Sequence, residues 1–114
     1  MTMTRTIIDE QILTATGNDL LSGTDLRQAP GPGAIAIWAA SDVSDSTITI
    51  RIGGSQGVSS IVVQNKGAGS PILTEQEAPY AFQPVRGGEN IRVDVVEVTA
   101  MNLRLKTVWH GLST

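Results

Sequence analysis

Hydrophobic and polar residues alternate along several short segments of this chain. In Thr47–Ile52, every second residue is an isoleucine, and threonine or arginine stands between them. Ile91–Val95 repeats the pattern with charged residues between the aliphatic ones. A period of two places the apolar side chains on one face of a strand. Both segments are therefore predicted to be half-buried strands.

Further strand candidates follow one another at spacings of about 8–12 residues, with glycine-rich or proline-containing turns between them. No segment has a helical period over three clear turns. The predicted strands are residues 34–40, 47–52, 58–65, 72–74, 80–82, 91–95 and 103–110. Seven to eight short strands in series predict an all-β antiparallel β-sandwich, jelly-roll or immunoglobulin-like, because two half-apolar sheets bury their faces against each other.

Two regions precede these strands. Residues 1–16 are interpreted as an N-terminal arm or edge strand, although the pattern fits a short helix about as well. Residues 17–114 are predicted to form a single β-sandwich domain whose long loop, residues 17–33, ends in Pro-Gly-Pro-Gly. Prolines remove backbone donors and disfavour helix, and a loop of this length inside a compact domain is usually functional or mobile.

Composition supports the β assignment and narrows the chemistry. The 114 residues include 11 isoleucines, 10 valines and 12 threonines, which favour strands. The net charge is -3, which argues against general nucleic-acid binding. No signal peptide is recognised, and the longest apolar run, Ala34–Ala40, is too short to cross a bilayer, so we expect synthesis in the cytoplasm. The absence of cysteine excludes disulfides and thiolate metal sites.

Candidate catalytic and metal-binding residues are few. His110 is the only histidine, at the end of the last predicted strand, and an exposed or interface position is expected for it. Asp42 and Asp45 lie in a serine-containing turn, which acidic residues favour without any bound calcium. Glu75 and Glu77 lie two residues apart without another polar cluster nearby. We therefore predict no catalytic site, no metal site and no cofactor.

Apolar residues outside the strands point instead to contacts with other chains. Leu20, Leu21 and Leu26 lie in the long loop and are predicted either to be covered by another chain or to fold back over one end of the sandwich. Trp38 and Trp109 are expected in the core or in a subunit contact. The candidate interface residues are Thr4, Arg5, Thr6, Ile7, Ile8, Leu20, Leu21, Leu26 and Trp109.

This profile resembles the small β-sandwich head-decoration, or cement, proteins of tailed bacteriophages. The resemblance covers the whole chain: an acidic, cysteine-free β chain with a Thr-rich arm, a Pro-Gly loop and the closing segments 88–95 and 103–111. It implies a non-enzymatic virion protein on the capsid surface, a homotrimer, and binding to the major capsid protein at local three-fold positions. It also implies that the arm and the long loop contact the capsid.

Two other functions are compatible with the sequence. A carbohydrate-binding β-sandwich would expose Trp38, Tyr80 or Trp109 in a flat or grooved platform. A small hydrolase would place acidic residues or serines around His110. Exposure of the aromatic side chains separates the first alternative from a structural role.

Overall fold

The computed structural model confirms the all-β prediction. It describes residues 6–14, 16–42, 46–53, 55–64, 79–96 and 103–111, and none of these residues is helical. The described part thus has no helix that could span a membrane. Its strands are β1 (Thr6–Leu13), β2 (Gly33–Ser41), β3 (Thr47–Ile52), β4 (Ser55–Val62), β5 (Ala81–Val85), β6 (Ile91–Val96) and β7 (Leu103–Gly111).

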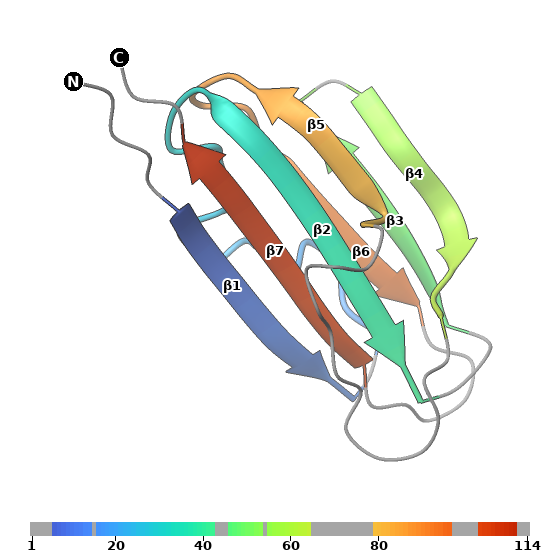
Figure 1. Ribbon diagram of the computed structural model, residues 1–114. Helices are drawn as coiled ribbons and strands as arrows, with labels where there is room; N and C mark the ends of the chain where they lie inside the picture. Colours follow the sequence, from blue (N-terminus) through green and yellow to red (C-terminus); the bar gives the residue numbers. More distant parts are fainter. Residues whose placement is uncertain are drawn as a thin grey trace.

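The strands form two antiparallel sheets that face each other (Figure 1). One sheet has the order β1-β7-β2-β5 and the other has the order β4-β3-β6. The central strand β7 pairs with β1 on one side and with β2 on the other, each in an unbroken register. The first and last strands of the domain are therefore neighbours.

The long loop supplies a partial fourth member of the smaller sheet. Gly17 forms an antiparallel bridge with Val95, and Gln28 forms one with Asn90. With segment 17–28 placed beside β6, the chain passes between the sheets in the order of a jelly roll. Of the two topologies that the sequence left open, the jelly roll matches this strand order.

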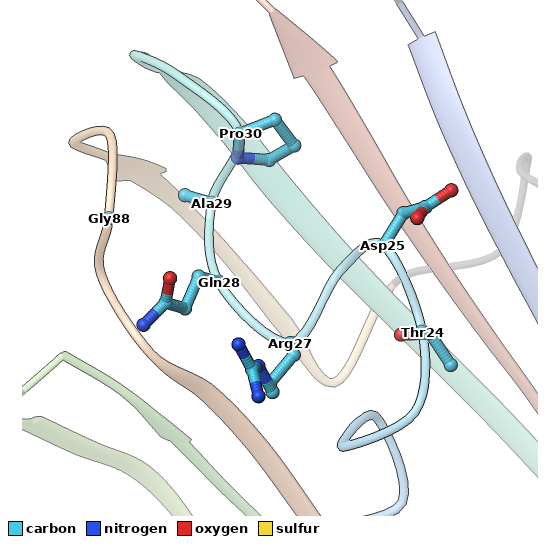
Figure 2. Close-up of a pocket in the computed structure, with 7 residues that line it drawn as sticks. All are labelled: Thr24, Asp25, Arg27, Gln28, Ala29, Pro30 and Gly88. Atoms are coloured by element: carbon cyan, nitrogen blue, oxygen red, sulfur yellow. The ribbon is translucent and has the colours of Figure 1, made fainter.

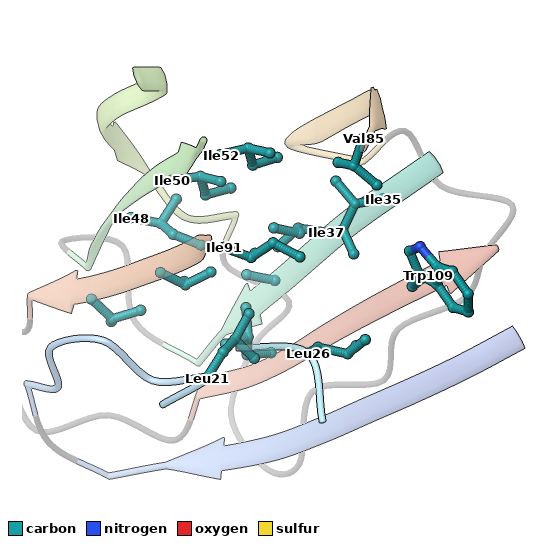
Figure 3. Packing of buried hydrophobic residues seen from close by; sticks show 14 of the residues in the cluster. Leu21, Leu26, Ile35, Ile37, Ile48, Ile50, Ile52, Val85, Ile91 and Trp109 are labelled. Atoms are coloured by element: carbon teal, nitrogen blue, oxygen red, sulfur yellow. The ribbon is translucent and has the colours of Figure 1, made fainter. Parts of the chain in front are cut away.

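The core lies between the two sheets (Figure 3). Ile35 and Ile37 of β2 point toward Ile48 and Ile50 of β3, and all four are fully buried. The alternation in Thr47–Ile52 is confirmed, because its isoleucines face inward and Arg51 faces outward. For β3, the period of two in the sequence was therefore enough to predict both the strand and its buried face.

A second apolar cluster lies on the other face of the larger sheet. Ala36, Trp38 and Ala40 alternate with the inward residues of β2, and together with Val108 of β7 they are buried. This explains why β2 is buried along nearly its whole length. Ala36 and Ala40, each two residues from Trp38, therefore belong with it to a second apolar cluster.

Turn glycines and prolines occupy the positions that their backbones favour. Gly53 and Gly88 have φ values of 62° and 86°, which side-chain-bearing residues rarely adopt, and they follow β3 and β5 respectively. Pro84 lies in β5, an edge strand. Edge strands are one of the few places in a sheet where proline, which lacks a backbone donor, is found. The predicted strand 72–74 lies outside the described residues.

Candidate functional site

β1 forms one edge of the larger sheet. All eight residues of β1 pair with β7 in continuous register, and among the described residues no other segment pairs with its backbone. In Figure 1, β1 lies at the border of the larger sheet. An edge strand presents a row of unpaired backbone donors and acceptors on its free side. β1 can therefore accept a further strand.

The side chains of β1 divide into two faces. Ile7 and Leu13 face inward and pack against the core. Ile8 and Ile12 face outward and are 53% and 63% exposed. Between them, Glu10 lies opposite Lys106 of β7, with its Oε1 4.0 Å from the lysine Nζ. Two exposed isoleucines thus flank one weak surface ion pair on the outer face.

Polar contacts hold the inner face of β1 in place. The Gln11 Nε2 donates to the Asp9 Oδ2 at 2.9 Å and to the Leu20 carbonyl at 2.7 Å. At the start of the strand, the Thr6 Oγ1 lies 3.2 Å from the His110 Nδ1. These contacts join β1 to the loop and to β7.

The other three edges each carry a feature that discourages pairing. β5 is short and contains Pro84, and the pairing of β4 with β3 contains two register shifts. The edge of β6 is closed by the chain itself, because Gly17 exchanges two backbone hydrogen bonds with Val95 at 3.0 and 2.8 Å. β1 alone among these edges is long, regular and open within the described part of the chain.

The structure places three of the predicted arm residues on β1. Thr6 and Ile8 are exposed on β1, whereas Ile7 is half-buried against the core. Thr4 and Arg5 lie outside the described residues. Ile12 was missed, although it is the more exposed of the two outer isoleucines. Its spacing of four from Ile8 was the available signal, because residues four apart share one face of a strand.

The predicted contact with another chain is wrong for Leu21 and Leu26, which the structure buries. Leu21 and Leu26 are fully buried, and they lie in the core between the two sheets (Figure 3). Leu20 is half-buried and packs against the same core. The loop folds back over the sandwich because burying these side chains removes apolar surface from water. That was the second of the two alternatives.

Trp109 also belongs to the core and not to an interface. It is 4% exposed, and its Nε1 donates to the Gly31 carbonyl at 3.3 Å. Trp38 is 6% exposed, and Tyr80 is half-buried with its hydroxyl accepting from the Gln64 backbone N–H at 2.7 Å. None of these three aromatic rings provides the exposed platform that the carbohydrate-binding alternative requires.

One aromatic side chain that the sequence reasoning passed over is prominent on the surface. Phe82 of β5 is 68% exposed. The strand registers place Phe82, Ala36, Val108 and Ile8 in one row across the outer face of the larger sheet. The two ends of this row are exposed and its middle is buried, so the exposed apolar side chains of the row lie on the two edge strands, β1 and β5.

Two hollows between the long loop and residues 88–92 are lined mainly by polar residues. The first, of about 390 Å³, is formed by the long loop and the turn at Gly88, with Gln28 lying toward that turn and Asp25 pointing away from it (Figure 2). The second, of about 410 Å³, shares Arg27 and includes Arg92. Arg92 is already paired with Asp94 at 3.2 Å. Both hollows are open and lined mainly by surface side chains.

The described residues offer little reactive chemistry. They contain no group of three or more histidine, cysteine, aspartate or glutamate side chains that could hold a metal. His110 is exposed, as expected, and its Nδ1 lies 3.2 Å from the Thr6 Oγ1. The acidic pair Glu75 and Glu77, and Asp45, lie outside the described residues. The features with the clearest binding potential are therefore the β1 edge and its exposed isoleucines.

No protein-family model, curated protein or solved structure matches this chain.

Proposed function

We propose that this protein is a non-enzymatic structural protein that binds an assembled capsid shell and stabilises it, as capsid decoration proteins do. The observation that carries the proposal is the β1 edge, an ordered eight-residue strand with two exposed isoleucines and no described partner besides β7. The overall resemblance of the sequence to phage decoration proteins supports the choice of a shell as the larger assembly.

The β1 edge would work by joining its sheet to a neighbouring chain. Backbone hydrogen bonds along an added strand supply affinity, and side chains beside them supply selectivity. Ile8 and Ile12 would lose exposed apolar surface in such a contact. Each contact needs only modest strength, because several linked copies on one shell multiply their retention. A trimer, as the resemblance implies, is one way to link the copies.

A retention experiment on purified shells tests this function. Capsids that lack the chain are mixed with wild-type protein or with the double variant Ile8→Lys/Ile12→Lys, and the particles are separated on a density gradient. We expect wild-type protein to travel with the particles and the variant to be retained at least about tenfold more weakly, because lysine on an edge strand opposes pairing.

Phe82→Lys is the matched control. It places the same charge at an exposed apolar position on the opposite edge of the same sheet. We expect its retention to equal that of the wild type. Failure of the wild-type chain to travel with capsids would refute the proposed function, and equal loss in both variants would refute the role of the β1 edge.

A further inference from the structure

We propose that the partner of the β1 edge is an extended strand of the shell protein whose outward side chains are, in order, aliphatic, basic and aliphatic. The inference rests on the proposed function and deepens it, because it names the chemistry of the strand that the shell would present to this edge. The charges at the centre of β1 and the exposed isoleucines on either side of them lead to this pattern.

The charges of β1 are all negative. Asp9 and Glu10 are consecutive at the centre of the strand, and β1 contains no lysine, arginine or histidine. On the side that pairs with β7, the Glu10 Oε1 lies 4.0 Å from the Lys106 Nζ. On its free side, no described segment pairs with the strand. Opposite charges directly across a pair of strands are stabilising and like charges are destabilising. An added strand is therefore expected to place lysine or arginine opposite Glu10.

The exposed isoleucines define the positions on either side of that basic residue. Ile8 and Ile12 lie two residues before and after Glu10, on the same outer face, and are 53% and 63% exposed. Aliphatic side chains opposite them would remove apolar surface of both chains from water. The outer face reads isoleucine, glutamate, isoleucine in either direction. The same partner pattern is therefore expected for a parallel and for an antiparallel strand.

The same charges disfavour a second copy of this chain on the edge. A second β1 would bring another Asp9 and another Glu10 to an edge that already carries both. The Gln11 amide offers no compensation, because its Nε2 already donates to the Asp9 Oδ2 and to the Leu20 carbonyl, which uses both of its hydrogens. The charges of β1 therefore favour a different chain that carries a basic residue.

A peptide titration tests the predicted chemistry. Two short blocked peptides serve as probes, in which threonine alternates either with isoleucine, lysine and isoleucine or with isoleucine, glutamate and isoleucine. Backbone amide shifts of the protein are followed by NMR, at low salt, up to about millimolar peptide. We expect the lysine peptide to shift the amides of β1 and to bind about fivefold more tightly than the glutamate peptide. This preference should shrink at about 1 M salt, because the charges are exposed.

Charge exchange at Glu10 provides the variants. Glu10→Lys is expected to reverse the preference, and Glu10→Gln to remove it. Phe82→Lys is the matched control, because it changes the net charge by the same amount as Glu10→Gln but lies on the opposite edge of the same sheet. It should keep the wild-type preference. A third peptide, with serine in place of both isoleucines of the lysine peptide, should bind about tenfold more weakly than the lysine peptide.

Several outcomes would overturn the assignment. Binding of neither peptide would do so, and so would equal binding of both or a preference that Glu10→Gln leaves unchanged. Equal loss of preference in Phe82→Lys and Glu10→Gln would show that only the net charge matters. Dimerisation of the wild-type chain in light scattering, with β1 amides shifted on association, would identify a second copy as the occupant instead.

The two proposals fail independently. If Glu10→Lys reverses the peptide preference but the wild-type chain never travels with capsids, the strand chemistry stands and the proposed function is wrong. If Ile8→Lys/Ile12→Lys loses retention on capsids but the two peptides bind equally, the proposed function stands and the strand chemistry is wrong.

Discussion

The edges of β6 and β1 differ in whether another segment of the chain pairs with them. Along β6, the chain's own loop supplies backbone partners, including the Leu20 amide, which donates to the Val93 carbonyl at 2.9 Å. Along the free side of β1, no described segment does so. Both strands are regular, and both carry exposed residues on their outer faces.

The difference lies in what anchors the covering segment. The loop beside β6 contains Leu21 and Leu26, whose burial holds it against the sandwich. The loop that follows β1 in the sequence pairs with β6 and not with the free side of β1. The loop on the β6 edge is held by two buried leucines, so closing that edge contributes to stability. An open edge can instead pair with another chain. The following predictions test this contrast, from the largest expected effect to the smallest.

Removal of a loop anchor should produce the largest loss of stability. Leu26→Ala deletes a fully buried side chain, and we expect the free energy of unfolding to fall by about 3 kcal/mol. Urea denaturation measures this change. Ile12→Ala on the open edge is the control and should cost less than about 1 kcal/mol. Equal losses in the two variants would contradict the contrast between the edges.

Loss of a polar contact between the loop and β6 should have an intermediate effect on stability. The Asp94 Oδ1 accepts from the Asp19 backbone N–H at 2.7 Å and from the Arg92 Nε at 3.2 Å. Asp94→Ala should lower the unfolding free energy by about 1–2 kcal/mol and speed hydrogen exchange at the Leu20 amide. Asp94→Asn keeps an acceptor oxygen and should lose less. Unchanged exchange in Asp94→Ala would show that the contact does not hold the loop.

Replacing a buried hydroxyl on β7, the strand next to β1, should increase stability. The Thr107 side chain is fully buried, and its Oγ1 has no hydrogen-bond partner among the residues that the structure describes. Thr107→Val keeps the shape of the side chain and removes the unsatisfied group, so the unfolding free energy should rise by about 1 kcal/mol. Thr107→Ser keeps the hydroxyl and should not be stabilised. A loss of stability in Thr107→Val would mean that the hydroxyl is satisfied in solution.

The smallest effect on folding is expected at the open edge itself. Ile8→Lys and Ile12→Lys lie on the exposed face of β1, so each should change the unfolding free energy of a dilute, monomeric sample by less than about 0.5 kcal/mol. Thermal and urea unfolding at low concentration measure this. A loss of several kcal/mol would show that these side chains support the fold.

Sequence patterning predicted β3 and β6 more clearly than β1. β3 and β6 have one apolar and one polar face, so a period of two is visible in the residues. β1 carries isoleucine on both faces and Asp9 and Gln11 on the inner one. That mixture left strand and helix equally compatible, because an edge strand is buried on fewer sides than a central strand.

The interface residues were predicted less well, for a physical reason. Leucines in a polar, proline-ended loop are expected at the surface, but their burial depends on whether the loop crosses an open end of the sandwich. Likewise, Trp109 on the last strand could have faced either way until the position of Gly31 was known. Phe82 gave no signal of its own, since exposure depends on which strands border β5.

The sequence by itself determined the local features of this protein: the strands, the glycine turns, the edge position of the proline-containing strand, and the scarcity of reactive side chains. These follow from backbone preference and from the alternation of neighbouring residues. Only the tertiary structure decided that the loop closes the β6 edge, that Leu21, Leu26 and Trp109 lie in the core, and that no described segment covers the free side of β1. Those outcomes depend on contacts between residues far apart in the chain, such as Gly17 with Val95, which no local pattern encodes.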